Sequence, residues 1–190
     1  MRCAMRCPWA EHSDIERDWH DNEWGRIVRD DRGLFELLTL KGAQAGLAWR
    51  TVLNKRDAYR SVFHDYDIAR IAAMDDDEMA RAMADRSIIR HRLKVMSVRT
   101  NARIVQAMAV RGESLGEVLW AHTGGEPIVN AHAHPRELPM RTAVSDRMAL
   151  DLRRRGFRYA GTAICYGLMQ SAGMVDDHLA SCERHGQGLR

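Results

Sequence analysis

Two pairs of candidate metal ligands lie at opposite ends of this 190-residue chain. Cys7 and His20 are near the start, and His178 and Cys182 are near the finish. The second pair has the i, i+4 spacing that places two side chains on one face of a helix, whereas the first pair needs a loop to converge. Two thiolates and two imidazoles suit tetrahedral zinc, and four protein ligands leave no open position for a catalytic water. A metal bound here would therefore be structural and would hold the chain ends together.

Each of these residues also has an ordinary explanation. A buried cysteine often serves as a small hydrophobic residue, and a histidine often lies on the surface or is hydrogen-bonded in the core. Taken alone, the residues leave both interpretations open.

The composition is that of a globular protein. Hydrophobic residues make up 45% of the chain, enough for a core in one domain over residues 1–190 or in two small helical lobes around a cleft. No apolar run approaches the roughly 20 residues of a membrane span, and the start of the chain lacks the pattern of a secretion signal. We therefore expect a cytoplasmic protein, most simply a monomer, whose remaining cysteines Cys3 and Cys165 are thiols.

The charge distribution is more informative than the net charge of +3. Cations concentrate at residues 90–103 and again at residues 153–158. Such clusters occur in proteins that bind nucleic acids, but solvated helix faces often have the same composition.

The spacing of apolar residues predicts an all-α fold. From Leu34 onward they recur at three- and four-residue steps, and no convincing alternation of period two appears. Glycines and prolines interrupt this pattern between residues 122 and 143, which indicates a surface loop, and the polar residues 183–190 are expected to be mobile. Helices are predicted near residues 31–41, 44–60, from 75 onward, at 89–110, at 145–155 with Ser145 as the cap, and at 162–172.

Residues 152–162 have the pattern of a helix-hairpin-helix, in which a turn containing glycine joins two helices. Gly156 and Gly161 would let the backbone approach a DNA phosphate beside Arg158. The free backbone N–H groups at the start of the second helix would then bind the anion without reading the base sequence. An ordinary corner between two helices is the alternative.

Several blocks of sequence together resemble the bacterial 3-methyladenine DNA glycosylase I family. In order, they are CPW at 7–9, WHDNEWG at 19–25, GAQAGLAW at 42–49, IRHR at 89–92, RGFRYAGTAICY at 155–166 and DHLASC at 177–182. The resemblance implies a helix-hairpin-helix fold with a structural zinc bound by Cys7, His20, His178 and Cys182. It also implies a base-excision repair enzyme that acts on damaged double-stranded DNA.

The resemblance also implies a site for the damaged base. An enzyme of this kind rotates the nucleotide out of the duplex and holds the base between aromatic faces, which attract a cationic alkylated purine. Trp9, Trp19 and Trp49 are the expected clamp, although core packing is the commoner role of tryptophan. Gly46 and Leu47 would fill the gap that the rotated nucleotide leaves in the DNA.

The chain departs from the family pattern at the residues closest to the chemistry. Lys41 stands where the family has the glutamate that recognises the base, and an ammonium donates hydrogen bonds and repels a cation. Glu16 replaces an aromatic residue, Trp19 replaces a tyrosine, and Asp176 replaces an asparagine. Lys41, Asp176 and Glu16 are therefore the candidate catalytic residues, although Lys41 could equally be a solvated cation at a helix C-terminus.

Three hypotheses follow. In the first, 3-methyladenine is still excised, with Glu16 supplying the lost carboxylate. In the second, specificity has moved to another damaged purine with acceptors toward Lys41, and Asp176 stabilises the sugar cation or activates water. A variant of the second makes Lys41 a Schiff-base nucleophile in a strand-nicking lyase. In the third, the protein only binds distorted DNA.

Overall fold

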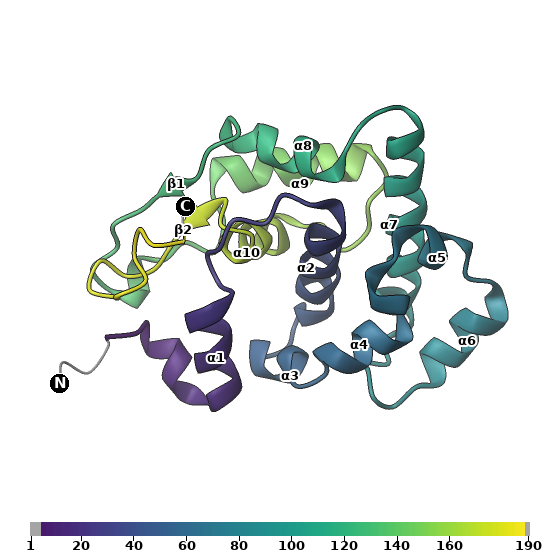
Figure 1. Ribbon diagram of the computed structural model, residues 1–190, viewed down its shortest axis with the longest axis horizontal. Helices are drawn as coiled ribbons and strands as arrows, with labels where there is room; N and C mark the ends of the chain where they lie inside the picture. The colour runs from purple at the N-terminus through teal and green to yellow at the C-terminus, as the bar shows by residue number, and fades with distance from the viewer. Residues whose placement is uncertain (1–4, 189–190) are drawn as a thin grey trace.

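The computed structural model describes residues 5–188 and is mostly helical, as the sequence predicts. Within this range there are ten α-helices, four short 3-10 segments and two strands of two residues each (Figure 1). The α-helices are α1 Asp14–Asn22, α2 Asp31–Gln44, α3 Trp49–Leu53, α4 Arg56–Val62, α5 Ile68–Ala73, α6 Asp76–Ala84, α7 Arg92–Val110, α8 Leu115–Trp120, α9 Ala143–Arg154 and α10 Thr162–Ser171. The strands are β1 Ile128–Val129 and β2 Val175–Asp176, and the 3-10 segments are η1 Pro8–His12, η2 His64–Tyr66, η3 Ala121–Thr123 and η4 Pro135–Glu137.

Helix α2 is the central element of the fold. It packs against α10, α7 and α8, and Figure 1 shows it in the middle of the molecule. Its side chains are apolar on nearly every face, with Leu34, Phe35 and Leu40 fully buried, as expected for a helix surrounded by others. Asp30 caps it by accepting the Gly33 N–H at 2.8 Å. A polar residue in the last turns of α2 is therefore carried into the interior.

The helix predicted at residues 44–60 is wrong. The chain instead forms a loop after α2 and then two short helices, α3 and α4. Gly46 has φ +76°, a left-handed conformation that a helix cannot contain, so the chain turns there before α3 begins at Trp49. The prediction that the preceding helix ends before Gly42 is also wrong, because α2 continues to Gln44.

The predicted helix ends are otherwise close to the observed ones. Asp75 caps α6 in a capping box with Glu78, in keeping with the predicted start. Helix α7 begins at Arg92 and not at residue 89, because His91 is its N-cap. Thr142, not Ser145, caps α9, and Ser145 forms the returning half of that capping box.

The two strands were not predicted. They pair in parallel, with Ile128 opposite Val175 and Val129 opposite Asp176. A strand of two residues has too few positions to show a period, so no alternation could have revealed it. The pairing ties the loop between α8 and α9 to the segment that carries His178.

Residues 183–188 lie beside the first residues that the structure describes (Figure 1). The Glu183 N–H donates to the Met5 carbonyl at 3.0 Å, and the Gly186 N–H donates to the Asp176 carboxylate at 2.6 Å. Cys3 and the last two residues of the tail predicted to be mobile lie outside the described residues. No described helix is long and apolar enough to cross a membrane.

Candidate active site and metal centre

The four predicted metal ligands converge in one buried cluster. The ligand atoms of Cys7, His20, His178 and Cys182 all lie within 4.8 Å of one another. Cys182 Sγ is 3.5 Å from His20 Nε2 and 3.6 Å from His178 Nδ1, while Cys7 Sγ is 3.8 Å from His178 Nδ1. These residues could hold one metal ion, which would join the two ends of the chain.

Local structure positions each ligand. Cys7 precedes η1, and His20 lies in the last turn of α1. The i, i+4 pair is not on a helix as the spacing predicted, because His178 to Cys182 follow β2 in a tight turn closed by the Cys182 N–H to the Leu179 carbonyl. A turn can bring two side chains separated by four residues together as well as a helix can.

In each of the two histidines, the ring nitrogen that points away from the cluster also has a partner. His20 Nδ1 is 2.8 Å from an Asp21 carboxylate oxygen, and His178 Nε2 is 3.2 Å from the Trp24 carbonyl. Such contacts orient metal-binding imidazoles and select which nitrogen faces the ion. The hydrogen bond between the two thiols lowers the pKa of Cys182 and raises that of Cys7, so one thiolate is favoured even without an ion.

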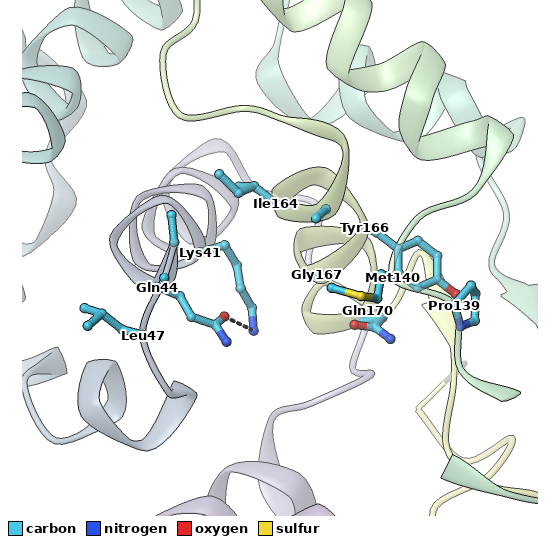
Figure 2. Close-up of a pocket in the computed structure, with 12 residues that line it drawn as sticks. Lys41, Gln44, Leu47, Pro139, Met140, Ile164, Tyr166, Gly167 and Gln170 are labelled. Carbon is cyan, nitrogen blue, oxygen red and sulfur yellow. Dashed lines mark hydrogen bonds between the residues drawn. The ribbon is translucent and has the colours of Figure 1, made fainter. Parts of the chain in front are cut away.

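A cavity lies apart from this cluster, and none of the four ligand residues lines it. It has a volume of about 650 Å³ and is lined by the end of α2, the Ala45–Leu47 turn, Pro139 and Met140, and one face of α10 (Figure 2). None of the residues that line it is acidic.

Lys41 is the charged residue of this cavity. Its side chain is only 8% exposed, and Nζ lies 3.5 Å from the centroid of the Trp49 ring. Nζ also donates to Gln44 Oε1 at 3.4 Å (Figure 2). Burial without a carboxylate partner lowers the pKa of the ammonium to about 7. The alternative of a solvated lysine at the helix end is therefore wrong.

Trp49, whose ring contacts the Lys41 ammonium, packs against a second tryptophan, Trp19. Trp19 meets Trp49 edge to face, with the ring centroids 5.4 Å apart, and Arg56 lies 5.0 Å from the Trp19 ring. The indole N–H groups of both tryptophans are buried without a hydrogen-bond partner among residues 5–188. Unpaired buried donors are uncommon in folded proteins, and a bound ligand or water is one explanation for them.

On the α10 side of the cavity, the buried carboxylate of Asp177 fixes the side chains of Tyr166 and Gln170. Asp177 accepts from the Tyr166 hydroxyl at 2.6 Å, from Gln170 Nε2 at 2.8 Å and from Asn130 Nδ2 at 2.7 Å. Its side chain is 0% exposed, and His132 Nε2 is 3.4 Å away. Burial, and then the bond to Asp177, raise the pKa of Tyr166. Sequence reasoning missed Asp177, Tyr166 and Gln170, although the i, i+4 spacing of the last two on an apolar helix was a usable signal.

The predicted hairpin joins α9 to α10 directly beside the cavity. Gly156 has φ +97°, and no side chain caps the start of α10 at Gly161. The Asn101 side chain fixes the turn by bonding the Arg158 N–H at 2.8 Å and the Arg158 carbonyl at 3.0 Å. The Arg158 side chain is exposed, so the turn presents a cation and free backbone donors on one surface.

Comparison with known proteins agrees with this geometry. The family model described as methyladenine glycosylase matches residues 9–185. The chain belongs to the methyladenine glycosylase family. It is 40% identical over 177 residues to DNA-3-methyladenine glycosylase 1 of Escherichia coli, which covers 93% of this chain and 95% of that protein.

Solved structures of methyladenine glycosylases have the same fold. A crystal structure of 3-methyladenine DNA glycosylase I matches with a TM-score of 0.93 at 42% identity, covering 95% of this chain and all (100%) of the other. A tyrosine-to-phenylalanine variant of a 3-methyladenine DNA glycosylase I, in complex with 3-methyladenine, matches with a TM-score of 0.89 at 27% identity, over 95% of this chain and 97% of that one. The predicted helix-hairpin-helix glycosylase fold is thus confirmed.

The structure separates the predicted site residues into two groups. Lys41, Gly46 and Leu47 line the cavity, with Trp49 in contact with Lys41. Trp9, expected in the base clamp, instead packs on His20 and Trp24 with centroids 5.4 and 5.0 Å away, so its contacts are those of the metal cluster.

The two predicted acids do not line the cavity either. Glu16 accepts from the Ser13 hydroxyl at 2.7 Å at the start of α1. Asp176 accepts the His178 N–H at 3.0 Å as well as that of Gly186, and so braces the turn that carries a metal ligand. The strand geometry of β2 turns Asp176 toward the tail, and the next residue, Asp177, reaches the cavity wall.

Proposed function

We propose that this protein is a DNA base-excision repair glycosylase that hydrolyses the N-glycosidic bond of alkylated purines, with 3-methyladenine as the principal substrate. One observation carries the proposal. Helix α10 forms both the phosphate-facing end of the hairpin and a wall of the cavity, so a nucleotide rotated out of DNA held at the hairpin has a place for its base. The names and the bound base of the related structures support the same substrate.

The DNA is held mainly through its backbone. Gly156, Arg158 and Gly161 present a cation and free N–H groups to a phosphate, which gives affinity without sequence preference. Leu47, 39% exposed at the mouth of the cavity, would enter the gap left by the rotated nucleotide, with Gly46 allowing the tight turn. The partner is thus damaged double-stranded DNA, bound by one copy of the chain.

The chemistry requires little from the protein. A purine alkylated at N3 carries a positive charge in DNA and leaves as a neutral base when the bond from C1′ to nitrogen breaks. Water then adds to C1′, and its proton passes to solvent. The residues of the cavity therefore bind and orient the base, and the Trp49 ring beside Lys41 is the proposed site of stacking. Trp19 packs behind Trp49, is 2% exposed and lines a separate cavity, so we give it no contact with the base. The carboxylates of Glu16 and Asp176 are already engaged elsewhere, so we assign neither to the reaction.

We infer that the metal is zinc and that its role is structural. With Zn–S near 2.3 Å and Zn–N near 2.0 Å, tetrahedral geometry places sulfur and nitrogen about 3.5 Å apart. The sulfur-to-nitrogen distances of 3.5, 3.6 and 3.8 Å fit that spacing. Cys7, Cys182, His20 and His178 would fill the coordination shell, and their burial excludes a substrate from the ion.

One observation favours a second candidate function. Lys41 places an ammonium where a cationic base would bind, and the residues that line the cavity include no carboxylate to offset it. A glycosylase of shifted specificity, for a damaged purine with acceptors toward Lys41, would use that ammonium as a donor.

Product analysis separates these functions. Methylated duplex DNA is incubated with the protein, and the released bases are identified by liquid chromatography against a blank without protein. Release of 3-methyladenine supports the proposal, and release of another purine alone supports shifted specificity. Binding of damaged duplex with no released base would identify a protein that only binds DNA. Borohydride treatment of the same reactions tests the lyase hypothesis, since only a Schiff base to Lys41 leaves a trapped adduct that Lys41→Gln abolishes.

A further inference from the structure

The side-chain amide of Gln170 is held in one orientation. Its Nε2 donates to the fully buried Asp177 carboxylate at 2.8 Å, and the reverse orientation would place two oxygens against each other. Oε1 is therefore the free end, and in Figure 2 it faces the side of the cavity where Lys41 lies. Oε1 accepts no hydrogen bond from the part of the chain that the structure describes.

The Lys41 side chain comes from α2 and packs on the face of α10 that carries Gly167. A Cβ added at Gly167 would lie 3.4 Å from Lys41 Cδ, so the lysine stem runs along this helix face. Gln170 lies three residues further on, which makes it the neighbour of Gly167 on the same face. A base that contacts Lys41 is thus within reach of the amide oxygen one turn away.

The cavity needs an acceptor that Lys41 cannot supply while it is protonated. An adenine-type base presents an exocyclic amine, which donates, and an ammonium also only donates. The side-chain oxygen of Gln44 already accepts from Lys41, and the Tyr166 hydroxyl donates its proton to Asp177. Of the two side-chain amide oxygens that line the cavity, Gln170 Oε1 is the one that accepts no hydrogen bond within residues 5–188.

We propose that Gln170, oriented by Asp177, accepts the hydrogen bond from the exocyclic amine of the damaged base and so selects adenine-type over keto purines. The inference rests on the proposed glycosylase function. Gln170 is a specificity-determining residue that contacts the base, and Asp177 is a positioning residue that acts through it. The acceptor is uncharged, so it operates beside Lys41 without an ion pair.

The test is the discrimination between two free bases. 3-Methyladenine and 3-methylhypoxanthine differ in carrying an amine or a carbonyl oxygen at the same position, and their binding is measured by calorimetry. Wild type should bind the amine-bearing base more tightly by about tenfold, because a carbonyl would face the Gln170 oxygen unpaired. Gln170→Met, which keeps the length of the side chain but lacks the amide, should lose that tenfold preference.

Matched variants exclude a general loss of structure. Gln106→Met changes an exposed glutamine on α7 that does not line the cavity, and should keep the full preference. Asp177→Asn, checked by thermal denaturation, should lower the preference without abolishing binding, because Gln170 can then rotate. If Asp177→Asn does not fold, Tyr166→Phe keeps the Gln170 contact and should retain the preference.

Binding at two pH values distinguishes Gln170 from Lys41 as the acceptor. An unchanged preference in Gln170→Met, or a wild-type preference that disappears at pH 6 where Lys41 is protonated, would overturn the proposal. Excision from methylated duplex is measured in parallel. A wild type that releases no base would refute the glycosylase function itself, whereas excision with an unaltered preference in Gln170→Met refutes only this inference.

Discussion

The metal cluster and the cavity are both buried polar regions, but they differ in how their groups are paired. In the cluster, each histidine has a ligand nitrogen directed inward and a second nitrogen bonded to protein. In the cavity, the Lys41 ammonium has no carboxylate among the lining residues. Behind it, the indole N–H groups of Trp49 and Trp19 have no partner within residues 5–188.

This difference indicates which region is structural and which is functional. Leaving a buried polar group unpaired costs about 1–3 kcal/mol, so such groups persist where a ligand supplies the missing partner. In the cluster, by contrast, the four ligand residues would be paired with the metal and with protein groups. They would stabilise the fold, and no polar group would remain for a substrate to bind. Substitutions in the two regions should therefore change different properties of the protein.

Loss of a metal ligand should affect stability more than any change in the cavity. Cys182→Ser should release the metal and lower the free energy of unfolding by at least about 4 kcal/mol, or the Tm by about 10 °C. Metal content by elemental analysis and thermal denaturation measure both effects. Cys165→Ala, at a buried thiol outside the cluster, should keep one metal per chain. An unchanged metal content in Cys182→Ser would contradict the assignment of this ligand.

Substitution of Trp49, beside the cavity, and of Trp9, beside the metal cluster, should affect different properties. Trp49→Leu should lower kcat/KM for excision by up to about a hundredfold with little change in metal content, since stacking on a base is worth about 1–3 kcal/mol. Trp9→Leu should lower stability and metal content, because its ring packs on His20, while the metal-loaded fraction keeps its kcat/KM. Equal losses of kcat/KM in both variants would indicate that Trp9 contacts the base, as the sequence predicted.

Excision should rise with pH through the pKa of Lys41. Burial lowers that pKa to about 7, so the side chain is charged and repels a cationic base at pH 6 but is mostly neutral at pH 8. Tyr166, whose pKa is raised, is the other titratable residue that lines the cavity. For one titrating group, kcat/KM should increase about tenfold over this interval. Lys41→Gln should show a flat profile, and a wild-type rate that falls with pH would contradict the assignment.

The smallest effect is expected at the mouth of the cavity. Leu47→Ala should reduce excision from duplex DNA by about fivefold while leaving single-stranded substrate nearly unaffected, because the side chain fills a gap that exists only in a duplex. Leu93→Ala, which also removes an exposed leucine but does not line the cavity, is the control. Parallel losses on both substrates would indicate a role inside the cavity instead.

Local patterns predicted much of the fold. The start of α2 at Asp31, the start of α6 near residue 75 and the hairpin before α10 all depend on residues within a few positions of one another. Failures occurred where the deciding contact was distant in the chain. Nothing near Ile128 indicates a strand, because its partner is Val175.

The sequence by itself determined the family and, through the resemblance, four residues that could hold a metal. Thiols and imidazoles can bind a metal by virtue of their donor atoms, so the family pattern pointed to these four residues before the fold was known, and the structure brings them together. Only the tertiary structure decided that Trp9 serves the cluster, that Asp176 braces a turn, and that Asp177 orients Gln170. Burial and pairing set the charge and direction of a polar group, and both depend on helices brought together from distant parts of the chain.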